Sequence, residues 1–289
     1  MRRYILPAIA LILMALYFLP YLFGGSKAPG SLLAMEIDSI KEMLIKKKGV
    51  EIELKREHDQ WQIVRPIKWR ADSARVRRIL EGLNEATLDT PVTSRKEDFP
   101  KYKISEEGDY LAVSDGNKTE RIYIGKRGAR YQLIYVRPER EKRVYLVKAS
   151  FADWLPDDVN TIRDKTLVSL SPEGISHVFW NTGDSSYSVV KKGKHWYGGS
   201  TEGKESERLS EEKIRAYLEQ FSSLEATGFA KDDRLPEKAV KTGLLRIIAD
   251  KTYSFELYKK DSQFYLVKDS VPYRISEYIK NRIFKKPAD

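Results

Sequence analysis

Two pairs of adjacent aspartates are the carboxylates in this sequence whose spacing could support chemistry. Asp157-Asp158 and Asp232-Asp233 each lie near a proline, in segments that resemble loops. Paired carboxylates can act as general acid and base, or bind a hard cation such as Ca²⁺. Aspartate is also common in turns, because its side chain accepts hydrogen bonds from nearby backbone N–H groups. We therefore interpret both pairs as turn residues and assign neither to a catalytic or metal site.

Histidine, serine and glycine patterns do not identify a site either. The chain has three histidines, of which His58 and His195 lie at or beside charged hairpin tips, and it has no cysteine, no HExxH motif and no GxSxG motif. The Gly198-Gly199-Ser200 segment lacks the lysine and hydroxyl residue of a phosphate-binding loop, so we predict a turn there. We expect no catalytic residue, no cofactor and no metal, and therefore no enzyme.

Trp61 and Trp196 could bind a sugar, because a flat indole face can stack on a pyranose ring. Each closes a segment in which apolar and polar residues alternate and which turns through a charged tip. A tryptophan at such a repeated position is more commonly a core residue, because its burial removes a large apolar area from water. We predict that both are core residues and keep glycan stacking as the alternative.

The chain is basic, but its charges are mixed. It carries 52 Lys and Arg against 42 Asp and Glu, a formal net charge of +10. Basic chains are attracted to nucleic acid, anionic lipid or acidic polymers. Here the two signs alternate, as in residues 137–143 and 204–215, which is typical of a solvated surface. We expect no nucleic-acid partner.

An uncharged run of twenty residues, Tyr4–Phe23, precedes the rest of the chain. At about 1.5 Å per residue a helix of this length spans about 30 Å of hydrocarbon. Arg2 and Arg3 precede the run, and such a flank stays in the cytoplasm. A cleaved signal peptide is the alternative, but Pro29 would follow the small-residue site and the run is longer than a usual signal core. We predict a retained single-pass anchor, with the bulk of the chain periplasmic or extracellular.

Two later segments of the chain resemble each other. VEIELKREHDQW ends at Trp61, and SSYSVVKKGKHW ends 135 residues later at Trp196. An amphipathic helix is predicted after each, with Asp72 or Ser210 as its N-cap. In both helices apolar residues recur at i, i+3, i+4 and i+7. These residues are Val76, Ile79, Leu80 and Leu83 in the first copy, and Ile214, Tyr217, Leu218 and Phe221 in the second.

Each predicted helix is followed by an acidic connection that contains proline, by several strands and by a short closing helix, near 151–155 and 276–284. The predicted fold class is α+β, with an N-terminal transmembrane helix followed by two tandem repeated sheet-plus-helix modules. We predict an anchor and exit linker over residues 1–30, a first module over 31–168 and a second over 169–289. Charge, proline and glycine in 163–174 indicate the boundary between the modules.

From about residue 32 to 284 the chain resembles the family catalogued as domain of unknown function 4340. The features that carry the resemblance are Trp61 with Pro66 and Ala71-Asp72, Ile124-Gly125, Val144-Tyr145-Leu146 and Ile162-Arg163-Asp164-Lys165. The resemblance implies a single-pass membrane protein of the kind often found beside subunits of gliding-type ABC transporters, without established catalytic residues. The chain departs from the usual family pattern at 101–104, where a Gly-Leu turn is more common.

Two functions remain open on the sequence. The first is a non-catalytic, membrane-anchored accessory or scaffold protein of an envelope complex, in line with an ABC-type transport system of the gliding class. Its partners would be membrane protein subunits, and residues 4–23 would contact the bilayer. The alternative is an exported binding module for a cell-wall glycan or anionic polymer, suggested by the positive charge and the aromatic content.

Overall fold

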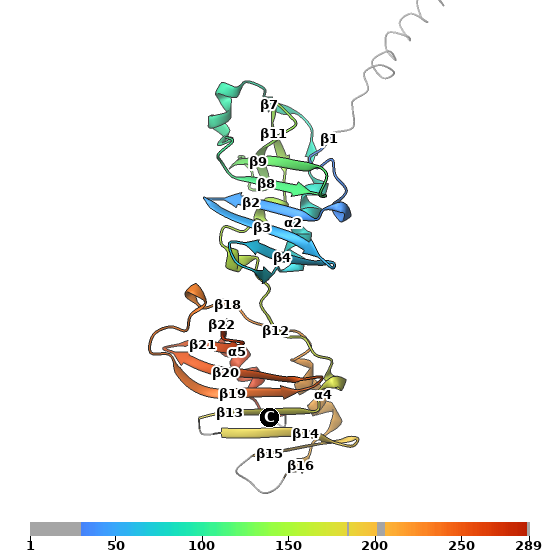
Figure 1. The fold of residues 1–289 in the computed structure, drawn as a ribbon, viewed down its shortest axis with the longest axis vertical. Coiled ribbons are helices and arrows are strands. Elements are labelled where there is room, and N and C mark those ends of the chain that lie inside the picture. Colours follow the sequence, from blue (N-terminus) through green and yellow to red (C-terminus); the bar gives the residue numbers. More distant parts are fainter. Residues whose placement is uncertain (1–29, 184, 201–205, 288–289) are drawn as a thin grey trace, which may run out of the picture. The chain divides into compact units, whose positions relative to one another are not determined.

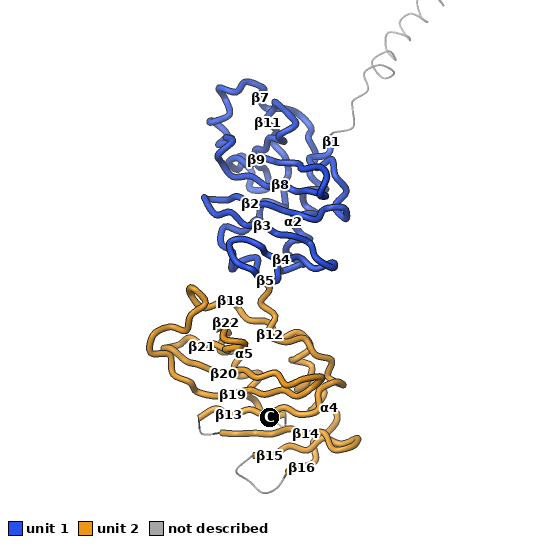
Figure 2. Tube along the Cα trace, in the orientation of Figure 1, with its two compact units in different colours: residues 1–163 blue, residues 164–289 orange. Residues whose placement is uncertain are grey.

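The computed structural model describes residues 30–183, 185–200 and 206–287. Within these ranges no helix is both long enough and apolar enough to cross a bilayer. The predicted anchor at residues 4–23 lies outside the described residues and stays a prediction. The chain divides into two compact units, residues 1–163 and 164–289 (Figure 2). The predicted module boundary follows residue 168, whereas the two units divide after residue 163. The strand β12 (Thr166–Val168) therefore belongs to unit 2 and not to the first module.

Unit 1 is built on a nine-stranded antiparallel sheet in the order β5-β4-β3-β2-β8-β9-β10-β11-β7, with a small separate pair β1-β6 (Figure 1). The elements of unit 1 are β1 (Gly30–Ser31), η2 (Ile37–Ser39), β2 (Glu42–Lys47), β3 (Val50–Glu57), β4 (Gln60–Arg65), β5 (Trp69–Arg70), α2 (Ser73–Glu85), β6 (Thr87–Leu88), β7 (Pro91–Thr93), η3 (Lys96–Tyr102), β8 (Tyr110–Ser114), β9 (Thr119–Arg127), β10 (Leu133–Pro138), β11 (Val144–Lys148), α3 (Phe151–Trp154) and η4 (Val159–Thr161).

Unit 2 repeats this topology strand for strand. Its nine-stranded sheet has the order β16-β15-β14-β13-β19-β20-β21-β22-β18, and β12 pairs with β17. Besides β12, the elements of unit 2 are η5 (Pro172–Gly174), β13 (His177–Thr182), β14 (Ser185–Lys192), β15 (His195–Gly199), β16 (Glu207–Arg208), α4 (Glu211–Glu219), β17 (Leu224–Glu225), β18 (Gly228–Phe229), η6 (Lys231–Asp233), β19 (Val240–Ile248), β20 (Thr252–Lys260), β21 (Gln263–Lys268), β22 (Val271–Ile275) and α5 (Glu277–Ile283). The mixed α+β class is therefore confirmed.

The two matching helices begin where the sequence predicts. The Asp72 carboxylate accepts a hydrogen bond from the backbone N–H of Arg75 at 3.0 Å, and the Ser210 hydroxyl accepts one from that of Lys213 at 3.3 Å. Each bond satisfies a backbone donor that the first helical turn leaves without an internal partner. All eight predicted apolar positions of the two helices are buried.

Each helix covers one face of its sheet, and this interface forms the core. In unit 1 the alternating residues Met43 and Ile45 of β2 and Ile52 and Leu54 of β3 are all almost fully buried under α2. The same face continues across β8 to β11. A second, smaller cluster lies on the opposite face, where Tyr110, Tyr123 and η3 pack together.

The prediction of a turn at Gly198-Gly199-Ser200 is wrong for its two glycines, which lie in β15. Packing explains the glycine at 198, because an added Cβ there would lie 2.4 Å from the Tyr187 hydroxyl oxygen and 2.9 Å from a Leu209 methyl carbon. The strand thus uses glycine to let a tyrosine of the neighbouring strand reach the core face.

Candidate functional site

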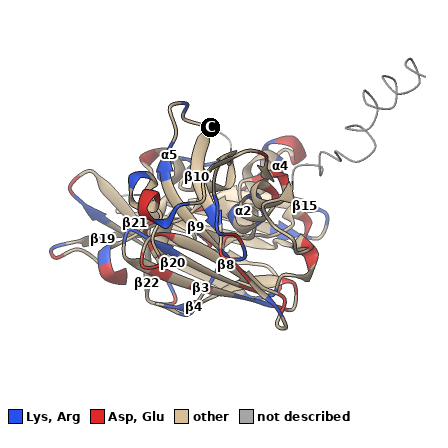
Figure 3. Cartoon of the chain, turned by 90° about the horizontal axis from the view of Figure 1, so that it is seen from above, with Lys and Arg blue, Asp and Glu red and all other residues tan. Residues whose placement is uncertain are grey.

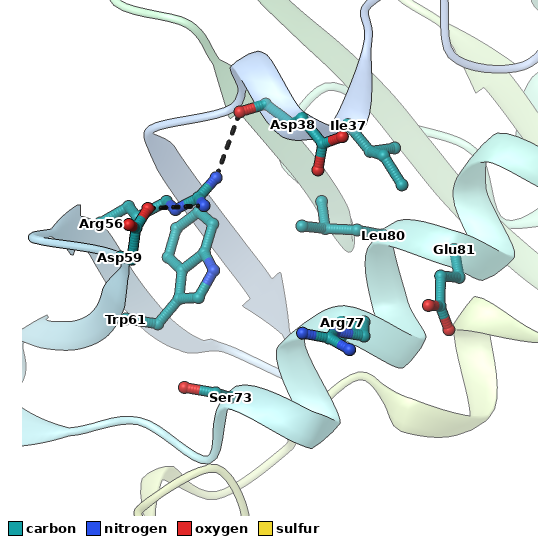
Figure 4. A pocket seen from close by; sticks show the side chains of 9 residues that line it. All are labelled: Ile37, Asp38, Arg56, Asp59, Trp61, Ser73, Arg77, Leu80 and Glu81. Atoms are coloured by element: carbon teal, nitrogen blue, oxygen red, sulfur yellow. Dashed lines mark hydrogen bonds and ion pairs between the residues drawn. The ribbon is translucent and has the colours of Figure 1, made fainter.

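A hollow of about 320 Å³ opens in unit 1 between the β3–β4 hairpin, η2 and α2 (Figure 4). We call it groove 1. The residues that line it are Ile37, Asp38, Arg56, Asp59, Trp61, Ser73, Arg77, Leu80 and Glu81. The side chains of Trp61 and Leu80 form its apolar part, and the indole lies between the hairpin and the helix. Trp61 is only 6% exposed, so its ring closes the groove without presenting an open face.

The hairpin wall of groove 1 is held by Arg56. Its guanidinium pairs with the Asp59 carboxylate at 2.9 Å and donates to the backbone carbonyl of Asp38 at 3.1 Å. His58 and Asp59 both have positive φ, so the tip is a tight two-residue turn that returns the chain directly into β4. The opposite wall is the exposed side of α2, with Arg77 and Glu81. Groove 1 is therefore narrow, charged with both signs and closed by an indole.

A matching hollow of about 270 Å³, groove 2, lies at the same place in unit 2. It is lined by Pro172, Glu173, Lys191, Lys194, Trp196, Glu211, Ile214, Arg215 and Leu218. The lining residues before β13 and on the β14–β15 hairpin match residues of η2 and the β3–β4 hairpin at an offset of 135. The lining residues on α4 match positions of α2 at an offset of 138. Trp196 is 8% exposed and again closes the groove. The duplication has thus preserved a surface feature as well as a core.

The two grooves differ in charge. Groove 1 has three carboxylates and two cations, whereas groove 2 has three cations and two carboxylates. The decisive exchange is at the hairpin tip, where Lys194 stands in the place of Asp59. In groove 2 the Ser171 hydroxyl bonds the Glu173 carboxylate and, with help from nearby Arg215 and Lys191, lowers the pKa of Glu173. Among the described lining residues, groove 1 thus has one net negative charge and groove 2 has one net positive charge.

The burial of Trp61 and Trp196 confirms the prediction that both are core residues. Sugar stacking needs an accessible ring face, and neither indole offers one. The grooves also bring no nucleophile within bonding distance of a general base. What they can do is accept a short charged segment or side chain of another polypeptide, with the apolar floor adding contact area.

Asp157 and Asp158 lie in a bend before η4, whereas Asp232 and Asp233 lie in η6, a short 3-10 helix. Asp157 pairs with Lys48 at 2.8 Å, and the Lys48 ammonium lowers the pKa of the Asp157 carboxyl. The Asp158 side chain accepts from the backbone N–H of Asn160 at 2.8 Å and so caps η4. Asp232 and Asp233 both have positive φ at η6. Among the described residues no three His, Asp or Glu side chains converge as metal ligands would.

One contact between residues of catalytic type was not foreseen from the sequence. His177 Nε2 lies 2.8 Å from the Ser188 hydroxyl across the β13–β14 pair, and burial lowers the pKa of His177. A serine nucleophile also needs a group that orients the histidine and a pocket for the substrate. In the described part of the chain no carboxylate bonds His177, and the positive charge of Arg246 lowers its pKa further. We therefore assign this pair to the sheet surface.

The spacing Ser-x-x-Lys, which is typical of one class of serine nucleophile, occurs at Ser188 and Ser210. Ser210 is committed to capping α4. Ser188 and Lys191 are three residues apart on a strand, so their side chains point to opposite faces.

Sequence reasoning also missed the two grooves, although the repeat contained a usable signal. Aligning the copies at offsets of 135 and 138 places Asp38 opposite Glu173, Arg56 opposite Lys191 and Arg77 opposite Arg215. Charge preserved at paired surface positions would have indicated a shared surface feature.

Comparison with known proteins yields one family and no closer relative. A family model described as Domain of unknown function (DUF4340) matches residues 61–244, which is more than half of the chain. No curated protein matches the chain. No solved structure matches it either. The matched segment begins at Trp61 in groove 1 and continues through groove 2 into β19. The chain therefore belongs to the DUF4340 family, whose function is unknown.

Proposed function

We propose that this protein is a non-catalytic, membrane-anchored accessory subunit of an envelope complex, and that it contacts partner subunits through grooves 1 and 2. The observation that carries the proposal is the preservation of the same indole-closed, charge-lined groove in both units. The family resemblance makes an ABC-type transport system of the gliding class the complex of first choice.

The charge distribution supports a protein partner over a polymer. Stretches of Lys and Arg are interspersed with stretches of Asp and Glu among the described residues in Figure 3. A polyanion needs a continuous positive track, whereas transient protein interfaces are small, polar and mixed in charge. The predicted anchor supports the proposal as well, because partners held in one membrane can associate through weak contacts.

The alternative, an exported binding module for a cell-wall glycan, has less support. Its strongest motivation was stacking on Trp61 and Trp196, and both rings are covered. Enzyme activity likewise lacks support from the side-chain contacts described above.

The test is affinity purification of the full-length protein from native membranes in mild detergent, followed by identification of the co-purifying proteins. We expect membrane transport subunits, and we expect Glu81→Lys in groove 1 to reduce their recovery. Glu85→Lys is the matched control, because it makes the same charge change one turn later on α2 but does not line the groove. Equal recovery from both variants and the unmodified protein would exclude groove 1 as the contact surface.

A further inference from the structure

The turn between β8 and β9 contains a motif that belongs to neither groove. Asn117, Lys118 and Thr119 form the sequence Asn-x-Thr, in which x is not proline. In exported proteins this spacing marks an acceptor for N-linked glycosylation, in which the asparagine amide receives a glycan. The chain has five asparagines, and only Asn117 has serine or threonine two residues later. Because so short a motif also occurs by chance, its structural surroundings decide whether it can act.

Every residue of the motif lies on the surface. Ser114 at the end of β8 pairs with Thr119 at the start of β9, so residues 115–118 form a four-residue turn. Asn117, Lys118 and Thr119 are all exposed. A glycan is bulky and hydrated, so its acceptor must lie where no packing has to be displaced. The β8–β9 turn satisfies this requirement.

The conformation of the turn leaves the Asn117 side chain available. Asparagine in a turn commonly bonds backbone groups nearby, which fixes its side chain. Here the Asp115 carboxylate has this role, because it accepts from the backbone N–H groups of Asn117 and Lys118 at 2.7 and 2.8 Å. Within the described ranges the Asn117 side chain and the Thr119 hydroxyl have no hydrogen-bond partner. Both groups of the motif are therefore open to a transferase.

The turn also lies beside the segment that follows the predicted anchor. Next to its two ends, the Ser114 carbonyl accepts from the backbone N–H of Lys41 at 2.8 Å, and the Glu120 carboxylate accepts from that of Ala34 at 3.0 Å. Seven peptide units separate Phe23, the end of the predicted anchor, from the first described residue, and they span at most about 25 Å. The glycan donors of this reaction are carried on membrane lipids. The motif is thus on the part of unit 1 that the predicted anchor holds near the donor.

Unit 2 supplies an internal comparison at the same place in its sheet. Its β19–β20 turn, residues 249–251, is one residue shorter. The Lys-Thr pair of the motif recurs at 251–252, at an offset of 133, but Asp250 precedes it where unit 1 has Asn117. Residues 250–252 are exposed as well. A carboxylate has no nitrogen to accept a glycan, so the two turns differ in the atom that the reaction needs.

We propose that Asn117 is an N-linked glycosylation site of the exported protein, and that its substrate is an oligosaccharide carried on a polyprenyl pyrophosphate. In this reaction the Asn117 amide nitrogen attacks the anomeric carbon of the glycan. A C–N bond forms as the C–O bond to the pyrophosphate breaks, and the lipid pyrophosphate leaves with the bonding electrons while the amide nitrogen loses one proton. A membrane transferase of the host supplies the catalysis, and this chain supplies the acceptor. The proposal rests on the predicted export of unit 1 and is independent of the groove contacts, because no residue of the turn lines groove 1.

The test is mass spectrometry of the full-length protein purified from native membranes, with fragmentation that retains the glycan and locates it within each peptide. We expect the peptide that contains residue 117 to carry a glycan. Asn117→Gln should remove it, and so should Thr119→Val, which keeps the shape of threonine without its hydroxyl, whereas Thr119→Ser should retain it. Asn281→Gln is the control, because Asn281 is also exposed but has isoleucine two residues later, and this change should leave the glycan in place.

Unit 2 provides a gain-of-function variant. Asp250→Asn completes the sequence Asn-Lys-Thr in an exposed turn and keeps an oxygen for the Tyr253 hydroxyl, which bonds Asp250 at 3.1 Å. A second glycan at residue 250 would support the proposal by showing that motif and exposure suffice. A glycan at residue 117 alone would support it too, and would show that the longer turn held by Asp115 is also needed.

An unmodified Asn117 in the native protein would overturn the proposal, as would a glycan on this peptide that survives Asn117→Gln. Protease added to sealed spheroplasts of the same cells separates the two reasons for an unmodified residue. Degradation of unit 1 would show that the chain is exported, so that the glycosylation proposal alone would be wrong. Protection of unit 1 would show that the chain is not exported, which would contradict the proposed envelope function as well.

Discussion

Trp61 and Trp196 occupy the same place in two copies of one hairpin and helix, and each is covered on its core side by the amphipathic helix that follows it. The indole of Trp61 packs into a cluster that includes Ile63, Val76 and Leu80. What differs between the copies lies at the rim, where Asp59 is replaced by Lys194. The tryptophan therefore has the same packing role in both copies, whereas the residue at the hairpin tip differs in charge.

Replacing Trp61 with alanine should lower the free energy of unfolding of unit 1 by about 3 to 5 kcal/mol, because it removes a large buried ring and leaves a cavity. Chemical denaturation monitored by circular dichroism measures this loss. Tyr278→Ala is the control, since Tyr278 is 71% exposed and its removal should change stability by less than about 0.5 kcal/mol. A Trp61→Ala variant as stable as the unmodified protein would refute the core assignment.

The elements divide into those that local sequence determines and those that depend on distant pairing. Both helices could be predicted, because cap and apolar spacing lie within one segment, and so could most strands of the two sheets. The pairing of β12 with β17 could not, because it joins two- and three-residue strands that are far apart in the chain. The strand position of Gly198 in β15 could not be predicted either. Its sequence is typical of a turn, and the reason for glycine there, the neighbouring Tyr187 side chain, comes from another strand. The grooves have this origin too, since their walls come from separate elements.

The contact between α2 and α3 depends on Gly82. Alanine normally favours a helix over glycine by about 1 kcal/mol. At this position the new Cβ would meet the Phe151 backbone nitrogen and the Ser150 hydroxyl oxygen, each at 2.6 Å, and α3 would have to move. We expect Gly82→Ala to destabilise unit 1 by about 1 to 3 kcal/mol, as overpacking does. Thermal unfolding measures the change.

The second unit supplies the control for that variant. Gln220→Ala changes the residue that corresponds to Gly82 at the helix offset of 138, and the shorter side chain introduces no clash. It also removes a buried amide without a partner in the described residues, so its stability should be unchanged or increased. If Gly82→Ala proved stabilising, the close approach of α3 to α2 would be wrong.

The whole molecule combines two duplicated units with a predicted membrane anchor. Either unit alone would present one groove, whereas the tandem pair presents two grooves of opposite charge bias on one chain. If the predicted anchor tethers the chain, two different contacts can join two partners, and each contact can be weak because a shared membrane concentrates the partners. This arrangement suits an accessory subunit better than a diffusible binding protein.

The anchor should therefore be required for function even when the soluble region folds. We would express residues 32–289 as an exported protein, confirm its fold by circular dichroism, and test whether it complements a deletion of the full-length gene at native expression. We expect poor complementation, because loss of the tether lowers the effective concentration of the partners by orders of magnitude while the weak contacts themselves are unchanged. Fusing the same region to an unrelated single-pass anchor of the same orientation should restore function. Full complementation by the untethered protein would remove the case for a tethered subunit and favour a diffusible binding protein. Failure of the unrelated anchor would show that residues 4–23 contribute specific contacts beyond tethering.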